Sequence, residues 1–112
     1  MSNLSENLKE QFMERYNQLK ASEHLLDASI NLLYSINSEE ACTIGIQDFI
    51  SKISEYKAYS DDANAVKQIL LEVSVNKREF NVALAELNYL YDVACYKQQR
   101  MCLMSQEFKC YF

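Results

Sequence analysis

Turn-forming and helix-breaking residues are nearly absent from this 112-residue chain, which contains one glycine and no proline. Sheet-rich folds need residues that tolerate positive φ in their hairpins, and Gly45 alone cannot supply a set of them. Without proline, long helices are not interrupted from within. We therefore expect an all-α protein. Because a domain usually holds about 100–200 residues, we expect one helical domain over residues 1–112.

Other absences limit where the protein works. No apolar run approaches the roughly 18 residues that a membrane span requires, so we expect no span. The first residues also lack the basic segment and apolar stretch of a signal peptide. These features predict a cytoplasmic protein. In that compartment we expect reduced thiols at the four cysteines, Cys42, Cys95, Cys102 and Cys110.

The charge is acidic overall and unevenly placed. The chain has 16 acids and 11 bases, a formal net charge of −5. Residues 1–62 hold 11 of the acids and 5 of the bases. No stripe of Lys and Arg is present to grip phosphates, so direct nucleic-acid binding is not expected. An acidic first half is, however, able to imitate nucleic acid, and we keep an acidic decoy that occupies a target's basic groove as the alternative function.

Catalytic and metal-binding patterns are missing. His24 is the only histidine, and no local motif brings a nucleophile to it. Cys95, Cys102 and Cys110 lie 7 and 8 residues apart, whereas structural zinc sites favour pairs two to four residues apart. One glycine cannot build a glycine-rich phosphate loop. We therefore predict no enzyme, no cofactor and no metal site.

Apolar residues recur at steps of three and four, the spacing of one buried stripe on a helix. This pattern predicts an antiparallel bundle of four helices, over about 4–36, 39–58, 61–74 and 77–109. Leu4 and Leu8 extend the first stripe toward the start. Ser60 is the expected N-cap of the third helix. Gly45 lies inside the second helix, where we expect a neighbouring helix to approach closely.

The boundary between the last two helices has two interpretations. Ser74, Val75 and Asn76 form helices weakly, and Asn76 with Glu79 resembles an N-terminal capping box, which favours a break. The apolar stripe nevertheless passes through this point unshifted. The alternative is therefore three helices, the last of them a rod of roughly 70 Å.

The last third of the chain is unusually apolar. From residue 80 to 112, 21 of 33 residues are apolar or aromatic, about 64% against 49% for the whole chain. A second row lies two residues after the first, about 200° around the helix, so the last helix is apolar on nearly opposite sides. Its members are Val82, Ala85, Tyr89, Val93, Tyr96, Arg100 and Leu103.

A helix that is apolar on opposite sides must be covered on both. Either the last helix is the central element of the bundle, or its second side meets another chain. We predict the second case: a small non-enzymatic binding module, such as an adaptor, chaperone-like subunit or inhibitor, that engages a protein partner or a second copy of itself. The predicted partner-binding residues are Val82, Tyr89, Val93, Tyr96, Arg100, Leu103, Met104, Phe108, Tyr111 and Phe112.

Overall fold

The computed structural model describes the backbone of residues 2–36 and 39–108 and the side chains of residues 6–36 and 43–103. It contains four α-helices, α1 (Ser2–Ser35), α2 (Glu39–Ser51), α3 (Ser60–Ser74) and α4 (Phe80–Phe108), and a short 3-10 helix, η1 (Ile53–Tyr56). No strand occurs in this part of the chain. The predicted all-α bundle of four helices is confirmed. The three-helix alternative is wrong because α3 and α4 are separate helices.

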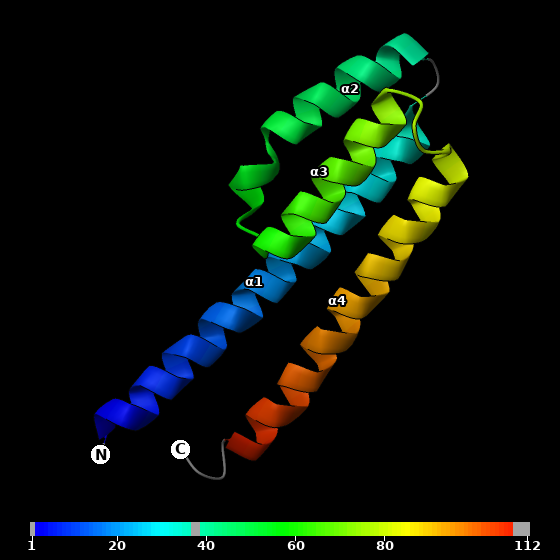
Figure 1. Ribbon diagram of the computed structural model, residues 1–112. Coiled ribbons are helices and arrows are strands. Elements are labelled where there is room, and N and C mark those ends of the chain that lie inside the picture. The colour runs from blue at the N-terminus through cyan, green and yellow to red at the C-terminus, as the bar shows by residue number, and fades with distance from the viewer. Residues whose placement is uncertain (1, 37–38, 109–112) are drawn as a thin grey trace.

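The four helices do not overlap along their whole length. α1 and α4 run side by side in opposite directions, while the shorter α2 and α3 cover only one end of that pair (Figure 1). The molecule is accordingly elongated, measuring 58 × 22 × 19 Å. We call the uncovered end, residues 2–20 of α1 and 97–108 of α4, the two-helix arm. The remainder is the four-helix end.

The hydrophobic core fills the four-helix end. The predicted stripes supply most of it, because their spacing places them on the inward face of each helix. Leu25 is also fully buried although it lies outside the predicted stripe, because α1 contacts both α3 and α4 and so buries a wider face. The largest fully buried apolar side chains are Leu25, Leu26, Leu33, Ile46, Val66, Leu70 and Leu87.

The predicted extension of the first stripe toward the start is wrong at Leu8, whose side chain is exposed. In the arm α1 has one neighbouring helix, α4, so fewer of its positions are covered. Leu4 lies outside the described side chains.

The second helix ends earlier than expected. It stops at Ser51 rather than near residue 58, and η1 continues the chain with tighter turns, as in the hydrogen bond from Lys52 N to Phe49 O at 3.0 Å. Ile53 is buried all the same, and the ring of Tyr56 lies 6.1 Å from that of Phe49. Ile53 therefore stays in the core although the backbone that carries it changes from an α-helix to a 3-10 helix.

The predicted N-cap of the third helix is displaced by one residue. Tyr59 occupies the N-cap position and Ser60 is already helical, with no side-chain cap. Instead, the buried Ser22 of α1 accepts a hydrogen bond from Tyr59 N at 3.1 Å. Asp61 and Asp62 lie in the first turn of α3, where their charges face the positive end of the helix dipole.

The break between α3 and α4 is confirmed, but Asn76 acts differently from the prediction. Its φ of 60° is left-handed, and its amide bonds Val73 O at 3.1 Å while the next amide, of Lys77, bonds Glu72 O at 2.8 Å. This pair of bonds is the Schellman arrangement that closes a helix C-terminus. Asn76 therefore ends α3 rather than capping α4. The described helices include none long and apolar enough to cross a membrane.

The expected close approach at Gly45 is not observed. A Cβ atom built there would meet only Leu32 Cδ1, at an ordinary 3.7 Å. Steric crowding therefore does not require glycine at this position.

Candidate protein-interaction surface

The outer side of α4 carries large apolar side chains that the described part of the chain leaves uncovered. Val82 is 45% exposed, Tyr89 68%, Tyr96 58% and Leu103 63%. These residues and Arg100 form what we call the outer row. On the opposite side of the same helix, Leu84, Leu87, Ala94 and Met101 are buried against the bundle. Among the described residues α4 is therefore not a central helix, because they cover only one of its two apolar sides.

Two neighbouring members of the outer row are held together. The guanidinium of Arg100 lies 5.9 Å from the centre of the Tyr96 ring, and its Nη1 donates a hydrogen bond to the Tyr96 hydroxyl at 3.2 Å. This hydrogen bond favours the charged guanidinium and raises the pKa of Arg100. Planar Arg side chains stacked on aromatic rings are typical of binding surfaces.

A groove between α3 and α4 continues the outer row toward the four-helix end. It has a volume of about 600 Å3. Val82 and Tyr89 are part of its α4 wall, and no described residue of α2 contacts α4 to cover it. Its lining is Ala65, Gln68, Ile69, Arg78, Val82, Ala85, Glu86, Tyr89 and Leu90. Small alanines on both walls leave room for a large side chain or a helix from outside.

One end of this groove is built by a cluster of charges. Arg78, in the segment between α3 and α4, pairs with Glu72 of α3 and Glu86 of α4, and its Nε donates to Glu72 Oε2 at 2.7 Å. Hydrogen bonds from Gln68 and then from Arg78 lower the pKa of Glu72. Two carboxylates share one guanidinium, so the cluster has a net charge of −1 and joins α3 to α4.

The structure describes only part of the predicted binding set. Val93 is half-buried and Arg100 is exposed. Met104 and Phe108 lie on α4, but their side chains are outside the described residues, as are Tyr111 and Phe112 altogether. The α3 wall of the groove and the Arg78 cluster were not predicted, because nothing in the local sequence shows which residues of two helices meet.

Leu19 of α1 and Met101 of α4 are buried where the arm begins, and polar side chains of the two helices meet there as well. Cys102 Sγ lies 3.6 Å from the Tyr16 hydroxyl, and this hydrogen bond is the main reason that the pKa of Tyr16 is raised. Hydrogen bonding with Cys95 similarly raises the pKa of Tyr91. Burial, followed by the negative charge of Glu23, raises the pKa of the Cys95 thiol. A thiol with a raised pKa stays protonated at neutral pH and is a poor nucleophile.

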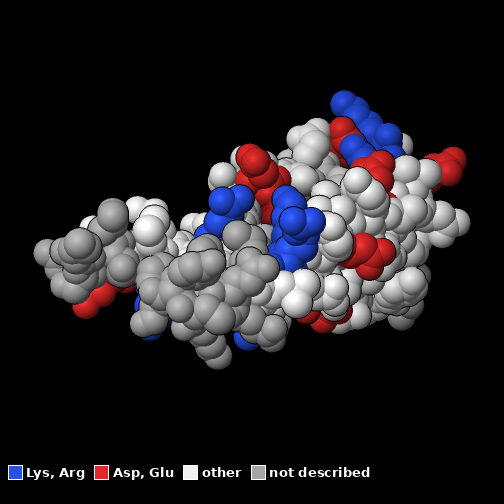
Figure 2. Space-filling model, turned by 90° about the horizontal axis from the view of Figure 1, so that it is seen from below, with Lys and Arg blue, Asp and Glu red and all other residues white. Residues whose placement is uncertain are grey.

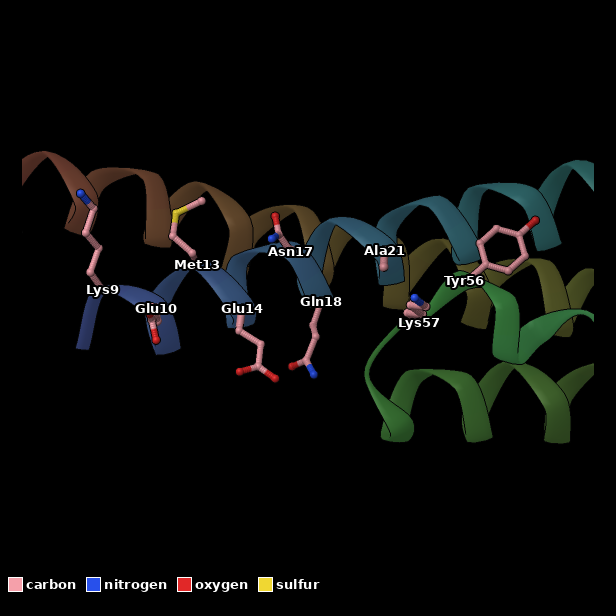
Figure 3. Close-up of a pocket in the computed structure, with 9 residues that line it drawn as sticks. All are labelled: Lys9, Glu10, Met13, Glu14, Asn17, Gln18, Ala21, Tyr56 and Lys57. Atoms are coloured by element: carbon pink, nitrogen blue, oxygen red, sulfur yellow. The ribbon is translucent and has the colours of Figure 1, made fainter. Parts of the chain in front are cut away.

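A second hollow lies where the four-helix end meets the arm. It has a volume of about 780 Å3 and is formed mainly by α1, together with Tyr56 and Lys57. Figure 3 shows Glu14 and Gln18 projecting from the same side of α1, beside the segment that carries Tyr56. The charged residues that line this hollow are of both signs, and none of its lining residues is buried.

His24, the one histidine of the sequence, is exposed on α1. Within the described part of the chain, no group of three or more His, Cys, Asp or Glu is arranged to hold a metal ion.

Charge does not accumulate on the face seen from below. Figure 2 shows Lys and Arg side chains lying among Asp and Glu side chains, with uncharged surface between them, and neither sign forms a continuous field. Such a mixture is typical of a polar rim around an apolar contact and unlike the basic track that holds a phosphate backbone.

Comparison with protein-family models, with curated proteins and with solved structures found no match to this chain.

Proposed function

We propose that this protein is a non-enzymatic binding module that engages another protein chain through the outer row of α4. One observation carries the proposal: Val82, Tyr89, Tyr96 and Leu103 are exposed together along one side of a helix whose opposite side is buried. An apolar row of this length on one helix is typical of helix-mediated recognition, in which anchors recur at steps of three and four. Tyrosine and arginine are also the residues that most often dominate binding energy at such surfaces.

The groove between α3 and α4 supports the same proposal. It widens the outer row at the four-helix end and adds the polar side chains of Gln68, Arg78 and Glu86. An apolar centre with polar groups at its edge is the usual organisation of a protein interface. A partner helix lying along the row would therefore contact α4 along its length and α3 at one end.

The test is a paired substitution on the row with a matched control elsewhere. Tyr89→Asp with Tyr96→Asp is expected to abolish partner binding while helicity and melting temperature stay nearly unchanged, because both side chains are exposed. Tyr34→Asp with Ile44→Asp is the control, since these side chains are 65% and 63% exposed but lie on α1 and α2. Binding is measured by affinity capture from the native host and, separately, with a second purified copy as the target.

The proposal fails if the row variant binds as well as the wild-type protein, or if the control variant loses binding equally. It also fails if the row variant unfolds, because these side chains would then be needed for the fold. The acidic-decoy alternative predicts a different result: binding that depends on residues 1–62 and collapses as salt is raised. Binding through the outer row is expected to be much less sensitive to salt, because its centre is apolar.

A further inference from the structure

We infer that the partner of the outer row is a second copy of this chain, with the two α4 helices packed side by side in antiparallel orientation. This inference rests on the proposed function and names its partner. A two-fold symmetric pair uses the same surface on both copies, so every contact occurs twice. The outer row suits such symmetry because its spacing is nearly the same in either direction: with Tyr89 opposite the second copy's Tyr96, Val82 lies opposite the second copy's Leu103.

Charge along one edge of α4 favours the antiparallel arrangement. Glu86, Lys97 and Arg100 recur at steps of 11 and 3 residues, which places them on the same edge of α4. The acid comes first and the bases last. In an antiparallel pair that edge meets the same edge of the other copy in the reverse direction, so Glu86 faces the bases of the other copy. Edge charges of this kind set the orientation of paired helices.

The contact that this arrangement creates is specific. With Tyr89 opposite Tyr96, Glu86 lies within one residue of the second copy's Arg100. Glu86 belongs to the cluster in which Arg78 forms ion pairs with both Glu72 and Glu86, so these three side chains together have a net charge of −1. A guanidinium from the second copy neutralises it. Arg100 is exposed and lies beside Tyr96, on the row that would face this cluster.

The shape of the molecule favours the same pairing. Each copy is thick at its four-helix end and thin along its two-helix arm (Figure 1). Antiparallel packing of α4 on α4 sets the arm of each copy beside the four-helix end of the other. Leu103, near the end of the described side chains, would then approach Val82 at the groove between α3 and α4. The second copy's α4 would fill the groove, which no described residue of α2 covers.

One contact opposes the pair. Asp92 is exposed near the middle of the row, on the edge opposite Glu86, so two copies bring their Asp92 carboxylates near the two-fold axis. The antiparallel arrangement therefore makes a second, independent prediction: Asp92→Asn tightens self-association, because it removes a like-charge repulsion without removing an apolar contact.

The experiment uses full-length chains that carry complementary charge changes. Copies with Glu86→Lys repel one another, since the introduced lysine faces Arg100 twice. Copies with Arg100→Glu also repel, since the introduced glutamate faces Glu86 twice. A mixture of the two variants restores an attractive contact between the introduced lysine and the introduced glutamate. We expect each variant alone to dimerise at least about tenfold more weakly than the wild-type protein and the mixture to recover most of that loss. Sedimentation velocity measures the association, with one variant fluorescently labelled.

Circular dichroism confirms the fold of each variant, because Glu86 also pairs with Arg78. If Glu86→Lys reduces helicity, the Glu86→Gln variant is used in its place. Glu86→Gln copies are still expected to bind Arg100→Glu copies more tightly than Arg100→Glu copies bind one another. A wild-type protein that stays monomeric at all concentrations overturns the inference, as does a dimer that shows no recovery on mixing. Either result leaves the proposed function intact if the capture of a different protein depends on Tyr89 and Tyr96. If the capture of that protein does not depend on these two residues, the proposed function is wrong instead.

Discussion

At the scale of single residues, small side chains have distinct structural roles. Ser22 and Ser29 of α1 are fully buried, and both hydroxyls are used: Ser22 accepts from Tyr59 N, and Ser29 donates to Leu26 O at 2.7 Å. Gly45 is different. It lies in the middle of α2 with negative φ and with space for a Cβ atom. Glycine there therefore adds only conformational freedom to the unfolded chain.

Because Gly45 has negative φ and space for a Cβ atom, we predict that Gly45→Ala stabilises the protein. Alanine is favoured over glycine in a helix interior by about 1 kcal/mol, and the added methyl group would make an ordinary contact with Leu32. The free energy of unfolding, measured by urea titration, should rise by about that amount with an unchanged m-value. A decrease would show that the space beside Leu32 is smaller than the structure indicates.

At the scale of elements, the corner between α3 and α4 is held by backbone and charge together. The Schellman bonds at Asn76 close α3, and the hydrogen bond from Ala83 N to Glu79 O, at 3.0 Å, begins α4. Arg78 lies between these points and contacts a glutamate on each helix. The corner therefore sets the angle at which α3 and α4 leave the loop, and so the width of the groove between them.

The corner also predicts a pH dependence. The pKa of Glu72 is lowered in the folded protein, so its contribution to stability is fully present above the ordinary glutamate pKa of about 4.3. It is lost as pH falls through the lower folded value. We expect the urea midpoint of the wild-type protein to drop more steeply between about pH 5 and pH 3 than that of Glu72→Gln. Parallel curves for the two proteins would show that Glu72 gains nothing from Gln68 and Arg78.

Elements were predictable from the sequence where one helix face determines burial. The step of three and four at Val66, Leu70 and Val73 predicted α3 almost to the residue. The end of α2 was not predictable, because η1 keeps Ile53 buried while the backbone changes to tighter turns. Asn76 was misinterpreted because asparagine serves both as an N-cap and as a left-handed helix terminator, and the local sequence does not separate the two.

The interaction surface was also only partly predictable from the sequence. Two apolar rows on α4 follow from spacing alone, and the structure leaves Tyr89, Tyr96 and Leu103 of the second row exposed. The groove was not predictable, because it depends on the angle between α3 and α4. The cluster around Arg78 was hidden for a related reason: its two glutamates are six and eight residues away on different helices.

At the scale of the whole molecule, stability should be uneven along the 58 Å axis. The cluster of buried apolar residues extends along α4 from Ala83 to Ala94, within the four-helix end. In the arm two helices share one narrow seam, and Leu8 and Met13 are exposed there. Regions with few buried apolar contacts open more readily than the core.

This unevenness predicts the pattern of amide hydrogen exchange. Amides of residues 6–18 in α1 should exchange at least about tenfold faster than those of residues 24–34 in the same helix. If the antiparallel pair forms, raising the protein concentration should slow exchange along α4 from residue 82 to 103. Mass spectrometry of deuterated peptides measures both effects. Uniform exchange along α1 would contradict the division into arm and four-helix end.

The polar contact between Tyr16 and Cys102 in the arm has a consequence for how α1 and α4 are aligned along their lengths. Directional contacts such as that between Tyr16 and Cys102 hold only at one setting of the two helices, whereas leucine against leucine tolerates sliding. A slip of α4 by one turn, about 5.4 Å, would separate that hydroxyl from its sulfur. The contact thus favours one register of α4 against α1, and that register fixes where Tyr89 and Tyr96 lie along the length of the molecule.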